Sequence, residues 1–315
     1  MTDLSHRLSL STCWCSARHN DGYEMLCEIR DLGFHQAELS HGIRVVLVPG
    51  ILKAIEEGII QISSVHNFCP LPSSVQHAAP NLFQPSAKKI GERETWLRYS
   101  RQTVEFAKSV GAQNVVMHSG SVDFPFLSPK PAIADPDASE SARQKAIDKL
   151  RKKASTEGTA TQRVIDGYRK LLPFATEHGI RLAAENREGI LELPLDDEFP
   201  HFFSHLTDTS AEGFPMGNRK LHYWHDTGHA QLKQSVGLIE HRELLESVSD
   251  KILGFHLHDV DDEGHDHQIP GTGTVDFSMI REFVRPNHTL VAELSPRLSR
   301  EDVLRSRNYL LEALG

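Results

Sequence analysis

The sequence lacks several features that would place it in a specialised class of protein. It contains 4 cysteines in 315 residues and no Cys-x-x-Cys pair, which argues against a disulfide framework. No apolar run approaches the roughly 18 to 20 residues needed to cross a bilayer. The first residues interleave Ser and Thr where a secretion signal would be apolar. We therefore expect a cytoplasmic protein with no membrane partner.

An excess of basic residues is also lacking. Lys and Arg number 34 against 43 Asp and Glu, which gives a formal net charge of −9 with neutral histidines. This charge disfavours a surface that binds nucleic acid, although a local basic groove can lie on an acidic protein. Hydrophobic residues make up 39% and charged residues 24%, as in a globular protein with a substantial core. The 19 histidines are numerous, and their positions carry the functional information.

Short runs of Val, Ile and Leu alternate with segments of helical period along the whole chain. This α/β alternation predicts a single (β/α)8 TIM barrel that forms one domain over residues 1–315. The predicted strands are 7–11, 36–39, 61–65, 114–117, 181–184, 221–224, 253–257 and 289–292. The predicted helices are 22–33, 51–58, 93–111, 162–179, 236–251 and 299–314. Four of them end at a glycine, which favours the left-handed conformation of a helix end: Gly33, Gly58, Gly111 and Gly179.

An insertion is expected between the fourth and fifth strands. Eight βα units need about 250 residues, so about 65 residues remain. Most of them lie in 121–160, which contains four prolines and then the basic stretch 143–153. Two interpretations stay open: a solvated insertion helix, or a lid over the barrel mouth whose Lys and Arg bind an anionic substrate.

Carboxylate or imidazole side chains follow the apolar run of seven of the eight predicted strands. The active sites of parallel barrels open at this C-terminal end of the strands. A metal site to which several strands contribute would explain the pattern. The residues are Glu38, His66, His118, Glu185, Asp226, His229, His256, His258 and Glu293.

The last four strands supply the group that we expect to bind the metal: Glu185, Asp226, His258 and Glu293. They are separated by 41, 32 and 35 residues, about one βα unit each. Carboxylates with one imidazole suit one divalent cation, Mn, Mg, Co or Zn, and three buried carboxylates without a cation would repel one another. His256 points the same way as His258 by strand alternation. We expect His258, nearer the strand end, to be the ligand and His256 to be a packed, hydrogen-bonded interior residue.

This chemistry suits a small polyhydroxylated substrate. A cation polarises a carbonyl and its neighbouring hydroxyl, so that a carboxylate can remove a proton from the adjacent carbon and form an ene-diolate. Return of the proton to a different position gives isomerisation or epimerisation, whereas loss of a hydroxyl gives dehydration.

Two segments carry a family resemblance: HDTGHA (225–230) and HLHDVDDEGHDHQIPGTGTVDF (256–277). With the strand-end series, they resemble the xylose isomerase-like TIM barrel superfamily of sugar phosphate isomerases and epimerases, inosose dehydratases and endonuclease IV. The resemblance covers roughly residues 7–295 outside the insertion. It implies metal binding by Glu185, Asp226, His258 and Glu293, with Glu185 and Glu293 also catalytic, exchanging the substrate proton from its two faces. It further implies that His229 binds a substrate oxygen.

The resemblance leaves three activities open. A sugar isomerase or epimerase of carbohydrate metabolism is the first, and an inosose or keto-sugar dehydratase is the second. The third is an endonuclease IV-like phosphodiesterase with three zinc ions, whose further ligands match His66, His118, His229 and His267. His265 departs from that pattern, which requires Asp, so His265 and His267 are candidate ligands of an additional metal. The chain shows no obvious basic or aromatic loop for intercalating into DNA.

In a sugar enzyme with one metal ion, we expect His66, His118 and His229 to contact the substrate. Trp14 could stack on a sugar ring or belong to the core. Arg187 could hold a substrate phosphate or hydroxyl, or form a salt bridge. The identity of the sugar, its phosphorylation and the oligomeric state stay open, and a homo-oligomer is one candidate assembly.

Overall fold

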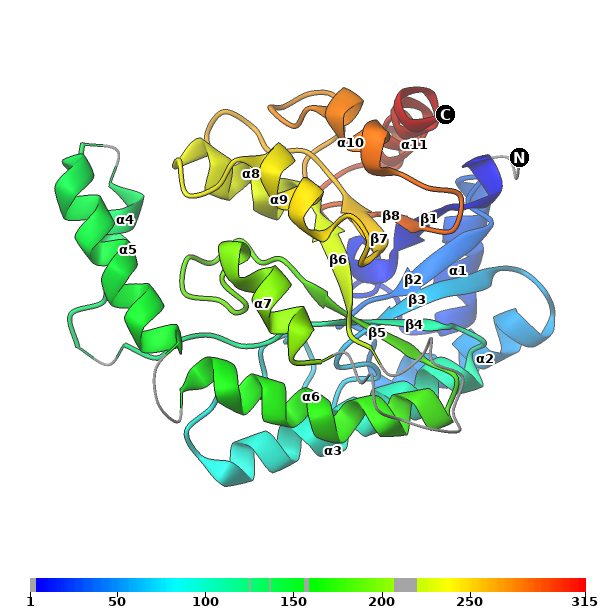
Figure 1. Ribbon diagram of the computed structural model, residues 1–315. Helices are drawn as coiled ribbons and strands as arrows, with labels where there is room; N and C mark the ends of the chain where they lie inside the picture. Colours follow the sequence, from blue (N-terminus) through cyan, green and yellow to red (C-terminus); the bar gives the residue numbers. More distant parts are fainter. Residues whose placement is uncertain (1–3, 125, 136, 156–158, 207–219) are drawn as a thin grey trace.

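Eight parallel strands close into a barrel in which each strand pairs with its neighbours in the sequence (Figure 1). The computed structural model describes residues 4–124, 126–135, 137–155, 159–206 and 220–315. The predicted (β/α)8 barrel is therefore confirmed. The strands are β1 (Leu8–Ser11), β2 (Gln36–Leu39), β3 (Gln61–His66), β4 (Asn114–Met117), β5 (Arg181–Glu185), β6 (His222–Asp226), β7 (Ile252–Leu257) and β8 (Thr289–Ala292).

Helices surround the barrel and connect its strands (Figure 1). The predicted segment 236–251 is helical only in its central part, and four short helices lie outside the predicted ranges, at 130–134, 199–204, 227–235 and 277–283. The helices are α1 (Gly22–Asp31), α2 (Val48–Glu56), α3 (Ile90–Ser109), α4 (Lys130–Ala134), α5 (Glu140–Ser155), α6 (Ala160–Glu177), α7 (Phe199–Ser204), α8 (Thr227–Ser235), α9 (His241–Val248), α10 (Phe277–Phe283) and α11 (Arg300–Leu314). Short 3-10 helices are η1 (Leu4–His6), η2 (Thr12–Trp14), η3 (Val45–Leu47) and η4 (Asp196–Glu198).

Local sequence signals end and begin several of these helices. The four glycines predicted at helix ends have φ angles of 82°, 70°, 75° and 74°, in the left-handed region that favours glycine. At the start of α11, the Ser299 side chain accepts a hydrogen bond from the Asp302 backbone N–H, and the Asp302 carboxylate accepts one from the Ser299 N–H. This reciprocal pair satisfies two N–H groups that have no partner within the helix.

The barrel interior holds a small apolar cluster beneath its C-terminal mouth. It comprises Val116, Ala183, Trp224, Leu253 and Val291, which come from the five consecutive strands β4 to β8. The Trp224 ring lies so close to Gly254 that a Cβ atom on this glycine would come within 2.5 Å of it. This layer is the floor on which the polar side chains of the site rest.

The insertion forms an arm of α4 and α5, which projects at the left of Figure 1. On the inner side of the arm, Ile147 and Leu150 of α5 share a small hollow with Ile190 and Leu195 after β5 and with Leu238 after α8. None of the described residues of 121–155 lines the large cavity at the barrel mouth. The lid therefore stays a prediction.

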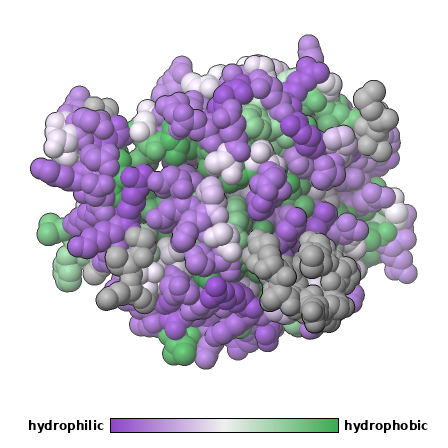
Figure 2. Space-filling view, in the orientation of Figure 1, coloured by the Kyte–Doolittle hydropathy of each residue, from purple (hydrophilic) through white to green (hydrophobic). Residues whose placement is uncertain are grey.

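The outer face of the molecule seen in Figure 2 is mostly hydrophilic, while the large apolar side chains are buried between strands and helices. Among the residues that the structure describes, no helix combines the length and the apolar character needed to cross a membrane.

Candidate active site

Three carboxylates project into the barrel one level above its apolar floor. Glu185 follows the floor position 183 by two residues, Asp226 follows 224, and Glu293 follows 291. Because alternate residues of a strand face the same side, all three enter the barrel at one height. Their exposed fractions are 1%, 0% and 5%, so water does not screen their charges.

His256 completes this group. One ligand atom from each of Glu185, Asp226, His256 and Glu293 lies within 4.8 Å of the others. The Nδ1 atom of His256 is 2.5 Å from Glu185 Oε1, 2.9 Å from Glu293 Oε2 and 3.8 Å from Asp226 Oδ2. Three carboxylates and one imidazole form a donor set that suits Mn, Mg, Co or Zn. The four buried residues, here named the central cluster, could therefore hold a divalent metal ion.

The structure brings His256 into the central cluster where we expected His258. His258 lies just beyond the end of β7, and its Nδ1 accepts a hydrogen bond of 2.9 Å from the backbone N–H of His267. Its Nε2 is then the protonated nitrogen and donates to Asp226, 2.9 Å from Oδ1. Both ring nitrogens of His258 are thus engaged, and the side chain orients Asp226 from outside the cluster.

Glu38 holds His256 from the side opposite the central cluster. Both Glu38 carboxylate oxygens are 3.1 Å from His256 Nε2. The same carboxylate accepts hydrogen bonds from Ser11 Oγ at 3.0 Å and Ser64 Oγ at 2.8 Å, because strand pairing sets these residues side by side. A carboxylate that accepts from Nε2–H leaves Nδ1 free to bind a metal, and this arrangement is common around metal-bound histidines.

The positive charge of His256 and the negative charges of the carboxylates around it stabilise each other. Burial alone would lower the pKa of His256, but the charges of Glu293, Glu38 and Glu185 raise it well above its usual value. Burial alone would raise the pKa values of Glu185 and Glu293, but His256 holds both well below their usual range. The carboxylates therefore stay ionised around one positive charge. A divalent cation fits the same position and would replace the proton on His256.

A second group of donors adjoins Glu185. His118 Nε2 is 2.8 Å from Glu185 Oε2, and His66 Nε2 is 3.6 Å from the same oxygen. Ligand atoms of these three residues lie within 4.8 Å of one another. Burial, and then the charge of Arg187, lowers the pKa of His118 well below its usual value, so His118 is neutral. The structure thus brings both predicted histidines to Glu185, whose catalytic role stays a prediction.

Arg187 forms the salt bridges that were one of its two expected roles. Its guanidinium lies 3.0 Å from Glu185 Oε2, 2.6 Å from Glu188 Oε2 and 3.4 Å from Glu192 Oε1. The side chain is only 11% exposed. Arg187 therefore orients Glu185, and its contact with a substrate stays a prediction.

A third group of donors, His229, His258 and His267, lies beyond Asp226. The backbone N–H of His229 donates to Asp226 Oδ1 at 2.7 Å, which caps the first turn of α8. Its Nδ1 lies 3.0 Å from the backbone carbonyl oxygen of Asn186 and donates to it. The Nε2 atom of His229 points into the cavity, where it lies 3.4 Å from Glu188 Oε2 and 3.9 Å from Asp266 Oδ2.

The structure separates the two candidate ligands of an additional metal. His267 stacks on His258 with 4.3 Å between ring centroids, and its Nδ1 is 3.0 Å from Asp266 Oδ1. His265 is 70% exposed and pairs with Asp261 at 3.0 Å on the surface. Asp266, rather than His265, supplies the acidic group beside His267.

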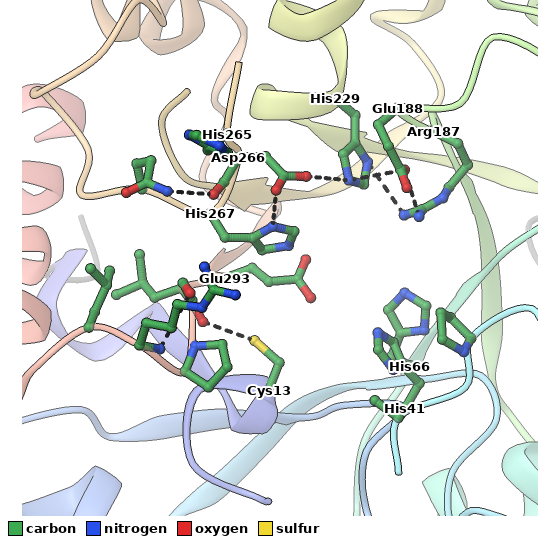
Figure 3. Close-up of a pocket in the computed structure, with 18 of the residues that line it drawn as sticks. Cys13, His41, His66, Arg187, Glu188, His229, His265, Asp266, His267 and Glu293 are labelled. Carbon is green, nitrogen blue, oxygen red and sulfur yellow. Dashed lines mark hydrogen bonds and ion pairs between the residues drawn. The ribbon is translucent and has the colours of Figure 1, made fainter. Parts of the chain in front are cut away.

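A cavity of about 810 Å³ opens above these groups (Figure 3). Glu293 is the member of the central cluster that lines it, while Glu185, Asp226 and His256 lie beneath. The wall combines histidines and charged groups with an apolar stretch after β8. Its residues are Cys13, His41, His66, Ala78, Pro80, Arg187, Glu188, His229, Gly264, His265, Asp266, His267, Gln268, Glu293, Leu294, Ser295, Pro296, Arg297 and Leu298.

His41 is a cavity residue that the sequence analysis did not predict. His41 follows β2 and stands edge-on to His66, with ring centroids 4.9 Å apart. Burial and the charge of His66 lower the pKa of His41 to about 3. Its place two residues after a strand end was the signal in the sequence. Trp14, by contrast, lies in the core with 2% exposure, and its Nε1–H donates to the Leu298 carbonyl oxygen at 2.9 Å, so the structure assigns it the core role.

The fold and site define a TIM barrel whose C-terminal mouth carries a buried cluster of carboxylates and histidines. The chain matches the sequence profile of the xylose isomerase-like TIM barrel family over residues 28–305, and it belongs to that family. No curated protein sequence matches the chain.

Several solved structures share this fold. A D-tagatose 3-epimerase-like protein has a TM-score of 0.67 and 16% identity, covering 98% of this chain and 97% of its own. The 3-keto-D-glucoside 4-epimerase from E. coli has a TM-score of 0.65 and 15% identity, with 97% and 98% covered. The D-allulose 3-epimerase from a Methylomonas species has a TM-score of 0.66 and 11% identity, with 98% of both chains covered. At these identities the likeness establishes the fold.

Proposed function

We propose that this protein is a divalent-metal-dependent isomerase or epimerase of a sugar or sugar phosphate. The observation that carries the proposal is the central cluster, in which three buried carboxylates and His256 converge below a cavity of about 810 Å³. The barrel also resembles three structures named as sugar epimerases or as similar to one, which supports the same class of substrate.

The residues that would hold the cation are Glu185, Asp226, His256 and Glu293, with His256 replacing the His258 of the sequence-based expectation. When bound, the divalent ion supplies polarisation of a substrate carbonyl and its neighbouring hydroxyl. Burial of the cluster strengthens every such charge interaction because water is excluded.

Proton transfer falls to Glu185 and Glu293. The carboxylate of Glu293 reaches the cavity wall, where it can take a proton from the carbon next to the carbonyl to give an ene-diolate. Glu185 lies below, fixed by His118 and Arg187, and returns or removes the proton from the other side. His229 lines the cavity and binds a substrate oxygen through Nε2, which the substrate would share with the nearby Glu188 carboxylate.

Deuterium uptake tests the proposal. The protein is loaded with Mn²⁺, Mg²⁺, Co²⁺ or Zn²⁺ and incubated with a panel of ketoses and ketose phosphates in deuterated water. We expect at least one sugar to take up deuterium next to its carbonyl and to form an isomer or epimer. Absence of uptake with every metal and sugar would refute the assignment, whereas a product lighter by one water would identify an inosose or keto-sugar dehydratase instead.

A metal-dependent phosphodiesterase is the second candidate. It is favoured by the two flanking donor groups, one that shares Glu185 and one that adjoins Asp226 through His258. Metal content separates the two functions, because an isomerase needs about one ion per chain and an endonuclease IV-like enzyme needs about three zinc ions. Cleavage of an abasic DNA duplex that stops with a chelator would reverse the order of the candidates. The cytoplasmic location and the oligomeric state stay predictions.

A further inference from the structure

The cavity is larger than a single sugar requires. A hexose has twelve non-hydrogen atoms, and even at roughly 30 Å³ each, the volume of a water molecule in the liquid, it would fill about 360 Å³. The cavity holds about 810 Å³. A sugar placed beside Glu293 would therefore leave more than half of the space to another part of the substrate or to water.

One side of the cavity is suited to apolar atoms. Residues 294–298, directly after β8, contribute Leu294, Pro296 and Leu298 to the lining, and Cys13 lies next to them. The Cys13 thiol donates to the Leu294 carbonyl oxygen at 3.4 Å, which joins the two segments (Figure 3). We name Cys13 and residues 294–298 the β8 wall. The side chains of Leu294, Pro296 and Leu298 offer no hydrogen-bond partner to a hydroxyl, so this part of the wall favours the apolar face of a ring, and a polar group left unpaired against it costs binding energy.

The other side carries two charged residues and a histidine. Arg187, Glu188 and His229 stand across the opening from Cys13 in Figure 3, and Glu293 lies between the two sides. The cavity therefore has a polar half over the central cluster and a more apolar half along the β8 wall. Such a division positions a substrate whose two parts differ in polarity.

We propose that the β8 wall binds a second ring that is joined to the reacting sugar through an oxygen remote from the carbonyl. The substrate is then a glycosylated keto sugar rather than a free monosaccharide. This inference rests on the proposed function, since the polar half must hold the reacting sugar.

Both a sugar ring and an aromatic ring offer the flat apolar face that Pro296 and Leu298 can cover. Arg297 adds a guanidinium to the same wall and has no ion-pair partner among the described residues, so it can donate to hydroxyls at the edge of the second ring.

Binding by isothermal titration calorimetry tests the proposal on the Mn²⁺-loaded protein. The probes are matched sets: D-fructose and D-tagatose, each free, as its 4-O- and 6-O-glucosyl derivatives, and as its 6-O-benzyl derivative. We expect at least one two-ring probe to bind at least tenfold more tightly than its parent sugar. The glucosyl and benzyl arms distinguish a sugar ring from an aromatic ring. No preference in any set, including no binding at all, would overturn the proposal.

Two variants locate the effect. Leu298→Ser and Arg297→Ala should each lower the affinity for the preferred two-ring probe at least fivefold. The affinity for the parent sugar should stay within twofold of the wild-type value. Arg305→Ala, on the exposed side of α11, is the control for loss of an arginine. Arg297 is exposed, so Arg297→Ala tests the wall even where Leu298→Ser lowers stability. Unchanged two-ring affinity in both variants would move the subsite elsewhere and refute the β8 wall.

The outcome is separable from that of the proposed function. Deuterium uptake without a two-ring preference would leave the isomerase or epimerase standing and remove the subsite. A two-ring preference that disappears with Arg297→Ala, but without deuterium uptake, would leave the subsite and remove the isomerase.

Discussion

Replacing Glu38 with glutamine changes the one side chain that holds His256 from the side opposite the central cluster. Glutamine keeps the size of the side chain and removes its charge. In the wild-type protein, the Glu38 carboxylate accepts hydrogen bonds from Ser11, Ser64 and His256 at 2.8 to 3.1 Å. All of these side chains are fully buried. A glutamine offers a single acceptor oxygen, and its NH₂ group needs acceptors of its own.

The expected cost follows from these contacts. Loss of a hydrogen-bond partner of a metal-binding histidine lowers metal affinity by about 10- to 100-fold. This range corresponds to about 1.4–2.8 kcal/mol of binding free energy. Glu38→Ala would leave three buried donors without an acceptor, at roughly 1–3 kcal/mol each, and would threaten the fold. The glutamine variant is therefore the sharper test.

Competition with a fluorescent chelator measures the dissociation constant for Mn²⁺ in both proteins. We expect Glu38→Gln to bind Mn²⁺ at least tenfold more weakly, with a circular dichroism spectrum like that of the wild type. Glu24→Gln, on the exposed face of α1, is the matched control and should leave the affinity unchanged. A folded Glu38→Gln protein whose Mn²⁺ affinity lies within twofold of the wild type would show that His256 is not a ligand oriented by Glu38.

Three further predictions concern catalysis, stability and the insertion. Glu185→Gln and Glu293→Gln should each lower deuterium exchange by at least about 10²-fold, because each removes a group that we propose to transfer the proton, and a near-normal rate would exclude that residue from proton transfer. Burial, and then the charge of Lys220, lowers the pKa of His222 to about 4 in the folded protein. Between about pH 6.5 and pH 4 the unfolded chain therefore binds a proton at His222 that the folded protein does not bind. The free energy of unfolding should fall over this range by up to about 1.4 kcal/mol per pH unit as the pH drops. Denaturant titrations should therefore give His222→Gln a shallower loss of stability over this range, while the exposed control His201→Gln keeps the wild-type slope. If the insertion is a lid, replacing 125–153 by a short linker should raise the Michaelis constant, and an unchanged constant in a folded variant would rule the lid out.

The barrel could be predicted because its strands are short, apolar and buried on both faces. The predicted ranges 36–39, 114–117 and 289–292 agree to the residue with β2, β4 and β8. Helix α8 was not predicted because its polar residues hide the helical period. Gln231 and Lys233 are buried in it, so no apolar face marks the segment.

Three of the four members of the central cluster could also be predicted. Glu185, Asp226 and Glu293 each stand at or just beyond the end of a strand, and alternation places them on the barrel side. The choice between His256 and His258 could not be made in this way, because the two share a face. Only the pairing of β7 with β6 sets His256 level with Asp226, and that register includes a shift after Tyr223 that the chain acquires on closing the barrel.

The sequence by itself determined the type of fold and the kind of residues at its mouth, because strand periodicity and strand ends are local properties. The tertiary structure alone decided which of these residues meet. Glu38 and His256 are 218 residues apart, and their contact across the barrel depends on the tilt and register of strands that no local pattern records.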